Sequence, residues 1–349
     1  MRRLLVALWL LCVLPPAQAG PWETNRALVS AVDAGSLAQI RRLIAQGADV
    51  NAVNDFGEPA LERAVQAGNS DAARLLLARG ADVNRGSRRG TPLVVAAEGD
   101  HGDKSIALCR LLLAHGADPN ADTHRVPLVA ALGALGWCSR MTLHPLGPAG
   151  RPEVVQAMIQ KRTRTALAIL RLLIGSGADV NHKDNMGHLN DRTTPLGAAA
   201  RAGSVEAMRL LLASGARDYP GYELGEAAAS GSAPAVAFLL SRGANPNGWR
   251  SAFSHNTALL NAVEADAPDC IRLLVNAGAD VNAQGGQGYT ALTHEMSRLK
   301  PSVAAVKLLL AHGADPNLAT EDGTTPLHLA EEAKEPELIT LLKSAGAKK

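Results

Sequence analysis

The sequence is short of aromatic side chains, because Phe, Tyr and Trp together make up only 3% of its 349 residues. Hydrophobic residues of all kinds still account for 47%, so the chain is not typical of disordered proteins. Little of an ordinary compact core can be built from aromatic rings here. Any core must be assembled from small and aliphatic side chains.

The chain also lacks an excess of charge of either sign and lacks paired cysteines. Its 35 Lys and Arg residues face 33 Asp and Glu residues, which gives a formal net charge of +2. Binding to nucleic acid depends on a positive field, so we expect no nucleic-acid partner. None of the 4 cysteines forms a Cys-x-x-Cys pair, so the sequence supports neither a zinc ribbon nor a thioredoxin-like redox motif.

Residues 1–19 have the pattern of a secretory signal peptide. Arg2 and Arg3 precede an apolar run over 4–14, and the small-x-small sequence of 17–19 ends in a cleavage site after Ala19. The run is shorter than the ~20 residues that a spanning helix needs, so we expect no membrane span. The pattern predicts export, to the periplasm of a Gram-negative bacterium or, alternatively, by secretion. Lipidation at Cys12 is a weaker alternative, since bulky Leu11 precedes it.

A Gly-Ala pair recurs after leucine-rich segments, at a spacing of 28 to 38 residues apart from one interval of 61. Most pairs continue as Asp-x-Asn, and about a dozen residues later most are followed by Thr-Pro-Leu or a relative of it, as in Thr325-Pro326-Leu327. The pairs begin at Gly47, Gly80, Gly116, Gly177, Gly215, Gly243, Gly278, Gly313 and Gly346.

These motifs resemble the ankyrin repeat over residues 22–349. The resemblance implies an all-α solenoid of about nine stacked helix pairs joined by short hairpin or finger loops. The residues agree with it: Thr caps the first helix, Pro fits its first turn, and glycines such as Gly203 end it in the left-handed conformation. A helix pair cannot bury its apolar stripe alone, so the units must stack into one elongated array.

Two places depart from the repeat. An insertion at about 136–162 falls inside the fourth unit, where a helix over 126–135 is expected to lead into a Pro/Gly-rich loop and then a further helix over 153–161. This insertion is either a plain loop or a dedicated contact element. In the sixth unit, residues 218–222 replace the finger, which is expected to bend the stack locally.

No motif of a known catalytic site or phosphate loop is present, so we expect neither an enzyme nor a cofactor. An enzyme using Cys138 and His144 of the insertion is a weaker alternative, because no orienting partner is identifiable. A long finger contains two His and two Asp residues, whose mixed spacing favours a solvated loop over a metal site: His182, Asp184, His188 and Asp191.

Three cysteines remain after removal of the signal peptide. Cys109 and Cys270 occupy positions that hold Ile, Leu or Val in other units, and they are most simply buried apolar thiols. A disulfide between Cys109 and Cys138 is an alternative hypothesis, because the two residues lie in adjacent units of an exported protein.

The array is predicted to be a monomeric scaffold that binds a protein partner through its fingers and the exposed side of its first helices. A role in neutralising or tethering an enzyme in the periplasm is an alternative that rests on family analogy. Among the aromatic residues, only Phe238 falls in a second-helix core segment. The candidate contacts are the aromatic, Met and Arg residues of the fingers: Phe56, Arg88, Arg89, Arg125, Met186, Trp249, Arg250, Phe253 and Tyr289.

Overall fold

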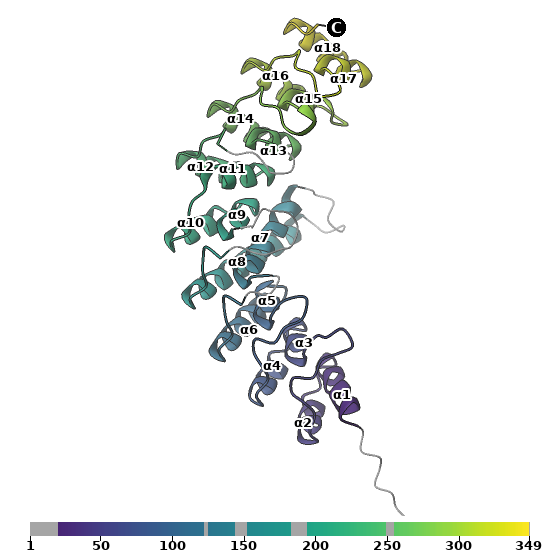
Figure 1. Ribbon diagram of the computed structural model, residues 1–349, viewed down its shortest axis with the longest axis vertical. Helices are drawn as coiled ribbons and strands as arrows, with labels where there is room; N and C mark the ends of the chain where they lie inside the picture. The colour runs from purple at the N-terminus through teal and green to yellow at the C-terminus, as the bar shows by residue number, and fades with distance from the viewer. Residues whose placement is uncertain (1–19, 122–124, 144–151, 183–193, 249–254, 349) are drawn as a thin grey trace, which may run out of the picture.

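The computed structural model describes residues 20–121, 125–143, 152–182, 194–248 and 255–348. These residues form a curved, elongated stack of helices (Figure 1). Within the described ranges there is no strand, only two isolated β-bridges in the fingers. The all-α solenoid predicted from the repeat is therefore confirmed.

Eighteen α-helices are found in the described part of the chain, and each consecutive pair is one repeat unit. Units one to five are α1 (Pro21–Asp33) with α2 (Leu37–Ala45), α3 (Ala60–Gln66) with α4 (Ser70–Leu77), α5 (Pro92–Ala97) with α6 (Asp103–Ala114), α7 (Pro127–Leu143) with α8 (Pro152–Gly175), and α9 (Pro195–Arg201) with α10 (Val205–Ala213). Units six to nine are α11 (Pro220–Ala229) with α12 (Ala233–Ser241), α13 (Ala258–Glu264) with α14 (Pro268–Asn276), α15 (Ala291–Met296) with α16 (Val303–Ala311), and α17 (Pro326–Glu332) with α18 (Pro336–Ser344). A short 3₁₀ turn, η1 (Gly286–Gly288), lies in a finger.

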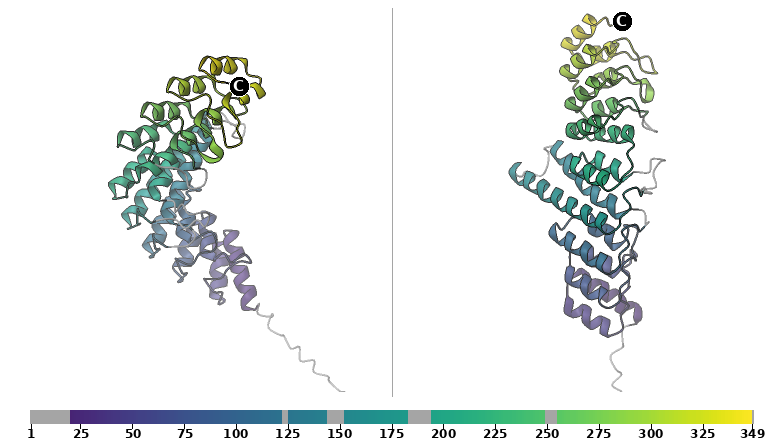
Figure 2. Two further views of the ribbon diagram at one scale, coloured as in Figure 1. Left: turned by 45° about the horizontal axis from the view of Figure 1, so that its top comes forward. Right: turned by 90° about the vertical axis from the view of Figure 1, so that its left-hand side faces the viewer.

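The helices form two layers, as Figures 1 and 2 show. Odd-numbered helices contact the odd-numbered helices of neighbouring units and line the concave side, while even-numbered helices do the same on the convex side. The core between the layers is continuous along the stack and consists mainly of Leu, Ala and Val side chains. Small side chains allow the helices to approach closely, which explains how so few aromatic residues suffice.

The Thr-Pro-Leu pattern marks the start of the first helix in units three, five and nine. The side-chain oxygen of Thr194 accepts a hydrogen bond from the Gly197 N–H at 3.0 Å, and that of Thr325 accepts one from the His328 N–H at 3.2 Å. Such caps satisfy a backbone donor that has no partner within the helix. The role expected for Thr is therefore confirmed.

The turn between the two helices of a unit uses the left-handed conformation. Gly203 has a φ of 65°, and a Cβ atom there would meet Cβ of Ser232 in the next unit at 2.7 Å. Both the backbone conformation and the close approach of the neighbouring unit therefore require glycine. In unit nine the corresponding turn is made by Lys334, whose φ of 56° is strained for a residue with a side chain.

A ladder of asparagine side chains joins consecutive fingers. The Asn84 side-chain oxygen accepts a hydrogen bond from the Asp118 N–H at 2.8 Å, and its amide donates to the Gly116 carbonyl at 3.3 Å. Asp82 fixes the same turn by accepting from the Asn84 N–H at 2.9 Å. Equivalent links to the next finger are Asn51 to Asp82, Asn120 to Asp179, Asn181 to Arg217, Asn247 to Asp280, Asn282 to Asp315, and Asn317 to Lys348.

The ladder is interrupted between units five and six. Tyr219 stands where the other fingers have Asn, and a tyrosine has no amide with which to bridge two fingers. The helix α11 begins at Pro220, directly after it. An ion pair of 3.1 Å between Arg242 and Asp218 joins the two units instead.

The insertion in unit four is organised differently from our expectation. We predicted a loop after residue 135 and a separate helix over 153–161, but α7 continues to Leu143 and α8 runs without a break from Pro152 to Gly175. The insertion thus lengthens both helices of the unit, which project beyond the stack in the right-hand view of Figure 2. The added part of α8 packs over the turn of unit three, where Arg162 pairs with Asp100 at 2.9 Å. This packing explains why the inserted residues extend α8.

Candidate functional site

Phe56 lies at the tip of the first finger and is 86% exposed. The turn around it is built by Asn54, whose side-chain oxygen accepts hydrogen bonds from the N–H groups of Phe56 and Glu58, both at 3.0 Å. The bridge between Val53 and Pro59 closes the finger below the turn. An ordered loop that holds an aromatic ring in solvent is typical of an interaction site.

The next finger presents two arginines. Ser87 and Gly90 form a bridge, and Arg88 and Arg89 between them are exposed. The Ser87 hydroxyl accepts from the Arg89 N–H at 3.1 Å and donates to a carboxylate oxygen of Glu62 at 2.7 Å. Two consecutive fingers thus display an aromatic ring and two guanidinium groups on ordered turns.

Glu62 is buried beneath this second finger. Burial raises the pKa of its carboxyl group, and the hydrogen bond from Ser87 opposes this shift in part. The carboxyl group therefore ties the finger to α3 and is not part of the exposed surface.

Two other candidates, Arg125 and Tyr289, serve the structure of the stack. The Arg125 guanidinium pairs with the Glu98 carboxylate of unit three at 2.5 Å. Tyr289 is partly buried, and its ring meets that of His294 edge-on, with centroids 5.9 Å apart. Both side chains thus make contacts between or within units, and their place on the partner surface stays a prediction.

The other candidate contacts lie outside the described residues. They are Met186, Trp249, Arg250 and Phe253. The partner surface is therefore argued below from the first two fingers.

The long finger after α8, which contains the two His and two Asp residues considered as metal ligands, is described only at its first residues. His182 is described, whereas Asp184, His188 and Asp191 lie outside the described residues. Within the described ranges, no group of three or more His, Cys, Asp or Glu side chains could hold a metal ion.

The concave face of the first helices was expected to contribute to binding. Several charged side chains of the first helices and of the turns after them pair across unit boundaries: Arg63 with Asp33 at 2.9 Å, Arg201 with Glu226 at 2.5 Å, and Arg298 with Asp266 at 2.8 Å. These arginines therefore join neighbouring units, and less of their charge is open to a partner. The finger tips are the more exposed part of the predicted surface.

The two cysteines described with their side chains are buried, as predicted. Cys109 and Cys270 are free thiols with no exposed surface, and burial raises the pKa of each to about 12. The hypothesised disulfide from Cys109 to Cys138 is not formed here, because Cys109 is a free thiol in the core of unit three. The side chain of Cys138, and His144 with it, fall outside the described residues.

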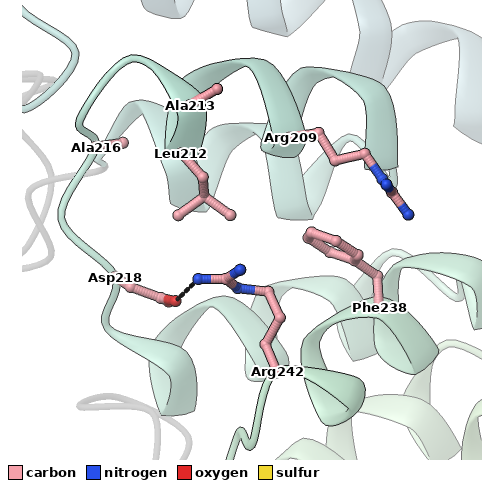
Figure 3. A pocket seen from close by; sticks show the side chains of 7 residues that line it. All are labelled: Arg209, Leu212, Ala213, Ala216, Asp218, Phe238 and Arg242. Atoms are coloured by element: carbon pink, nitrogen blue, oxygen red, sulfur yellow. Dashed lines mark hydrogen bonds and ion pairs between the residues drawn. The ribbon is translucent and has the colours of Figure 1, made fainter.

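A pocket that the sequence did not predict lies on the convex side, between α10 and α12 (Figure 3). Phe238 was expected in the core, but its ring is only partly buried and forms one wall of this pocket. The guanidinium carbon of Arg209 lies 5.1 Å from the ring centroid, and that of Arg242 lies 5.9 Å from it. Two signals could have indicated the place: Phe238 stands where most units have Leu, and Tyr219 interrupts the asparagine ladder.

Glu223, at the start of α11, is the other unusual side chain of unit six. It is fully buried, and neither carboxylate oxygen has a hydrogen-bond partner. Loss of water raises its pKa to about 8, and the negative charge of Asp218 adds to the shift. Other units have Pro or Ala at this place, as in Pro195 and Ala258.

No helix among the described residues is both long and apolar enough to cross a lipid bilayer.

Comparison with known proteins identifies the repeat. The family model described as ankyrin repeats (3 copies) matches residues 28–123, 155–248, 224–297 and 259–349. The nuclear factor NF-kappa-B p105 subunit of Gallus gallus is 41% identical over 92 residues, which cover 26% of this chain and 9% of that protein. A putative ankyrin repeat protein of fowlpox virus, FPV031, is 29% identical over 185 residues, which cover 52% of this chain and 45% of that protein.

Some similar proteins carry the names of enzymes. The intracellular phospholipase A2 of Caenorhabditis elegans is 39% identical over 98 residues, which cover 26% of this chain and 9% of the enzyme. The chain thus spans less than half the length of each of these relatives. The matches of the family model cover most of the sequence, and the chain belongs to the ankyrin-repeat family.

Proposed function

We propose that this chain is a non-enzymatic scaffold that binds a protein partner through its finger loops in an exported compartment. Ankyrin repeats are in general modules for binding other proteins. The finger tips of this chain are the surface on which we expect the partner to bind. The observation that carries the proposal is Phe56, an aromatic side chain held almost fully in solvent by an ordered turn.

The chemistry of the finger tips supports a protein as the partner. Aromatic and Arg side chains are enriched among the residues that contribute most to binding energy in protein interfaces. Phe56, Arg88 and Arg89 provide both kinds on two consecutive fingers. Since several arginines of the first helices and of the turns after them pair across units, we place the main contact on the fingers.

The proposal is tested by capturing the partner from the native compartment with tagged protein. Phe56→Ala is expected to lower capture severalfold, and combining it with Arg88→Ala and Arg89→Ala is expected to abolish it. Leu299→Ala is the matched control, because Leu299 is an apolar side chain that is 98% exposed elsewhere on the stack. Equal capture by the finger variants and the control would refute the placement.

Export is the second part of the proposal and rests on residues 1–19. If these residues direct export, the protein recovered from the periplasm of a Gram-negative host will begin at Gly20. Mass spectrometry of the intact protein measures this directly. A full-length chain found only in the cytoplasm would contradict export and would leave the finger proposal standing.

A scaffold of this kind acts on an enzyme partner in one of two ways. It either neutralises the enzyme or tethers it in an active form. Activity of the captured partner with and without the scaffold separates the two roles.

A further inference from the structure

The pocket between α10 and α12 has a volume of about 470 Å³ and is lined by both helices and by Ala216 and Asp218 of the connection that follows α10 (Figure 3). Ligand pockets in proteins typically measure about 300–1,000 Å³, so this one is large enough for one side chain and its backbone. It occurs beside the interruption of the asparagine ladder at Tyr219, where an ion pair replaces the usual link between fingers.

The pocket carries a net positive charge. Arg209 has no ion pair among the described residues, and its guanidinium group lies against the ring of Phe238. Arg242 lies near the same ring and pairs with Asp218 at 3.1 Å. Two guanidinium groups and one carboxylate leave an excess of one positive charge, so the complementary ligand group is an anion. A carboxylate fits a guanidinium group because it can accept two parallel hydrogen bonds.

Asp218 holds one of the two guanidinium groups in place. Its Oδ2 binds Arg242, while Oδ1 is buried and is not open to the pocket. The side of the pocket that a ligand can reach is therefore dominated by the two arginines.

The second feature is an apolar wall. Leu212, Ala213 and Ala216 come from the end of α10 and the turn after it, and the Phe238 ring faces them across the pocket in Figure 3. The ligand therefore has an apolar group close to its anion.

We propose that this pocket binds the C-terminal residue of a partner polypeptide, one that ends in an apolar side chain. In a C-terminal residue the carboxylate and the side chain both branch from a single Cα atom. The carboxylate pairs with Arg209 and Arg242, and the apolar side chain lies against Leu212 and the ring of Phe238. An internal Asp or Glu would need a second residue to supply the apolar group.

The test is a titration of the protein with acetyl-Gly-Ser-Ala-Leu, followed by chemical-shift changes in NMR spectra. The peptide with a free carboxylate is expected to bind about tenfold or more tightly than its C-terminal amide, because a charge-assisted contact is lost in the amide. Arg209→Ala should weaken binding of the free acid by a similar factor. Arg74→Ala is the matched control, since Arg74 is exposed at the same position of α4, six residues before its Gly.

Three results would overturn the proposal: equal affinity for the acid and the amide, equal effects of Arg209→Ala and Arg74→Ala, or equal binding of an amidated peptide with an internal Glu. The last result would assign the pocket to acidic side chains. The Phe56→Ala variant separates this site from the fingers, because it is expected to bind the peptide normally. The pocket proposal can therefore fail while the finger proposal holds.

Discussion

Glu223 makes the stability of the stack depend on pH. The pKa of its carboxyl group is raised from 4.5 to about 8 in the folded chain, because burial removes water from the group. The folded state therefore keeps the proton that the unfolded state releases. Stability from this group is greatest below pH 4.5, falls as the pH rises, and is lost above about pH 8.

The size of the effect follows from the shift. One pKa unit corresponds to about 1.4 kcal/mol, so Glu223 lowers the free energy of unfolding by about 3 kcal/mol at pH 7 and about 5 kcal/mol above pH 8. Glu223→Ala removes this cost and loses about 1–2 kcal/mol of packing. We expect a net gain of about 2 kcal/mol or more at pH 8.

The assay is urea unfolding followed by circular dichroism at several pH values between 5 and 9. Between pH 5 and pH 8, the free energy of unfolding of the parent should fall by up to about 1.4 kcal/mol per pH unit more than that of the variant. Glu153→Ala, which removes an exposed carboxylate at the start of α8, is the control and should keep the slope of the parent. The reasoning is refuted if Glu223→Ala also keeps that slope.

Three further predictions concern the ladder, the turns and the thiols. Asn282→Ala removes hydrogen bonds to Asp315 and Gly313 and should cost about 1–2 kcal/mol in urea unfolding; no loss would contradict the role of the ladder. Lys334→Gly removes the side chain from a residue with a left-handed backbone and should stabilise the protein by up to about 1 kcal/mol. A destabilised variant would contradict the claim that Lys334 is strained. Cys109 and Cys270 should resist iodoacetamide in the native protein and react in urea, as peptide mass spectrometry can show. Rapid native labelling of either would contradict its burial.

The repeat itself was predictable because its signals are local. Thr194 caps its helix through the N–H group three residues on, and Gly203 turns the chain within one unit. Such interactions depend on residues close in sequence, so their pattern can be read without knowledge of the stack. Burial of Cys109 followed from its place in the same pattern.

The helix bounds of the insertion and the pairing of Arg125 were not predictable from the sequence. Gly136 and the prolines near residue 150 favoured a loop, but packing against unit three extends α8 through the inserted residues. Arg125 was chosen as a contact by residue type alone. Its pairing with Glu98 depends on how two units stack. No sequence pattern predicts the distance between these two side chains.

The order of residues was enough to specify the repeat, its helices, its capping residues and its family, because each unit depends on neighbours in the chain. Packing between units settled two other matters, namely which charged side chains pair with one another and where a pocket opens. Arg209 and Arg242 belong to different units and meet at one Phe238 ring only after α10 and α12 have packed. The contact of both arginines with this ring depends on how whole units stack and on the side-chain conformations that the stacking allows.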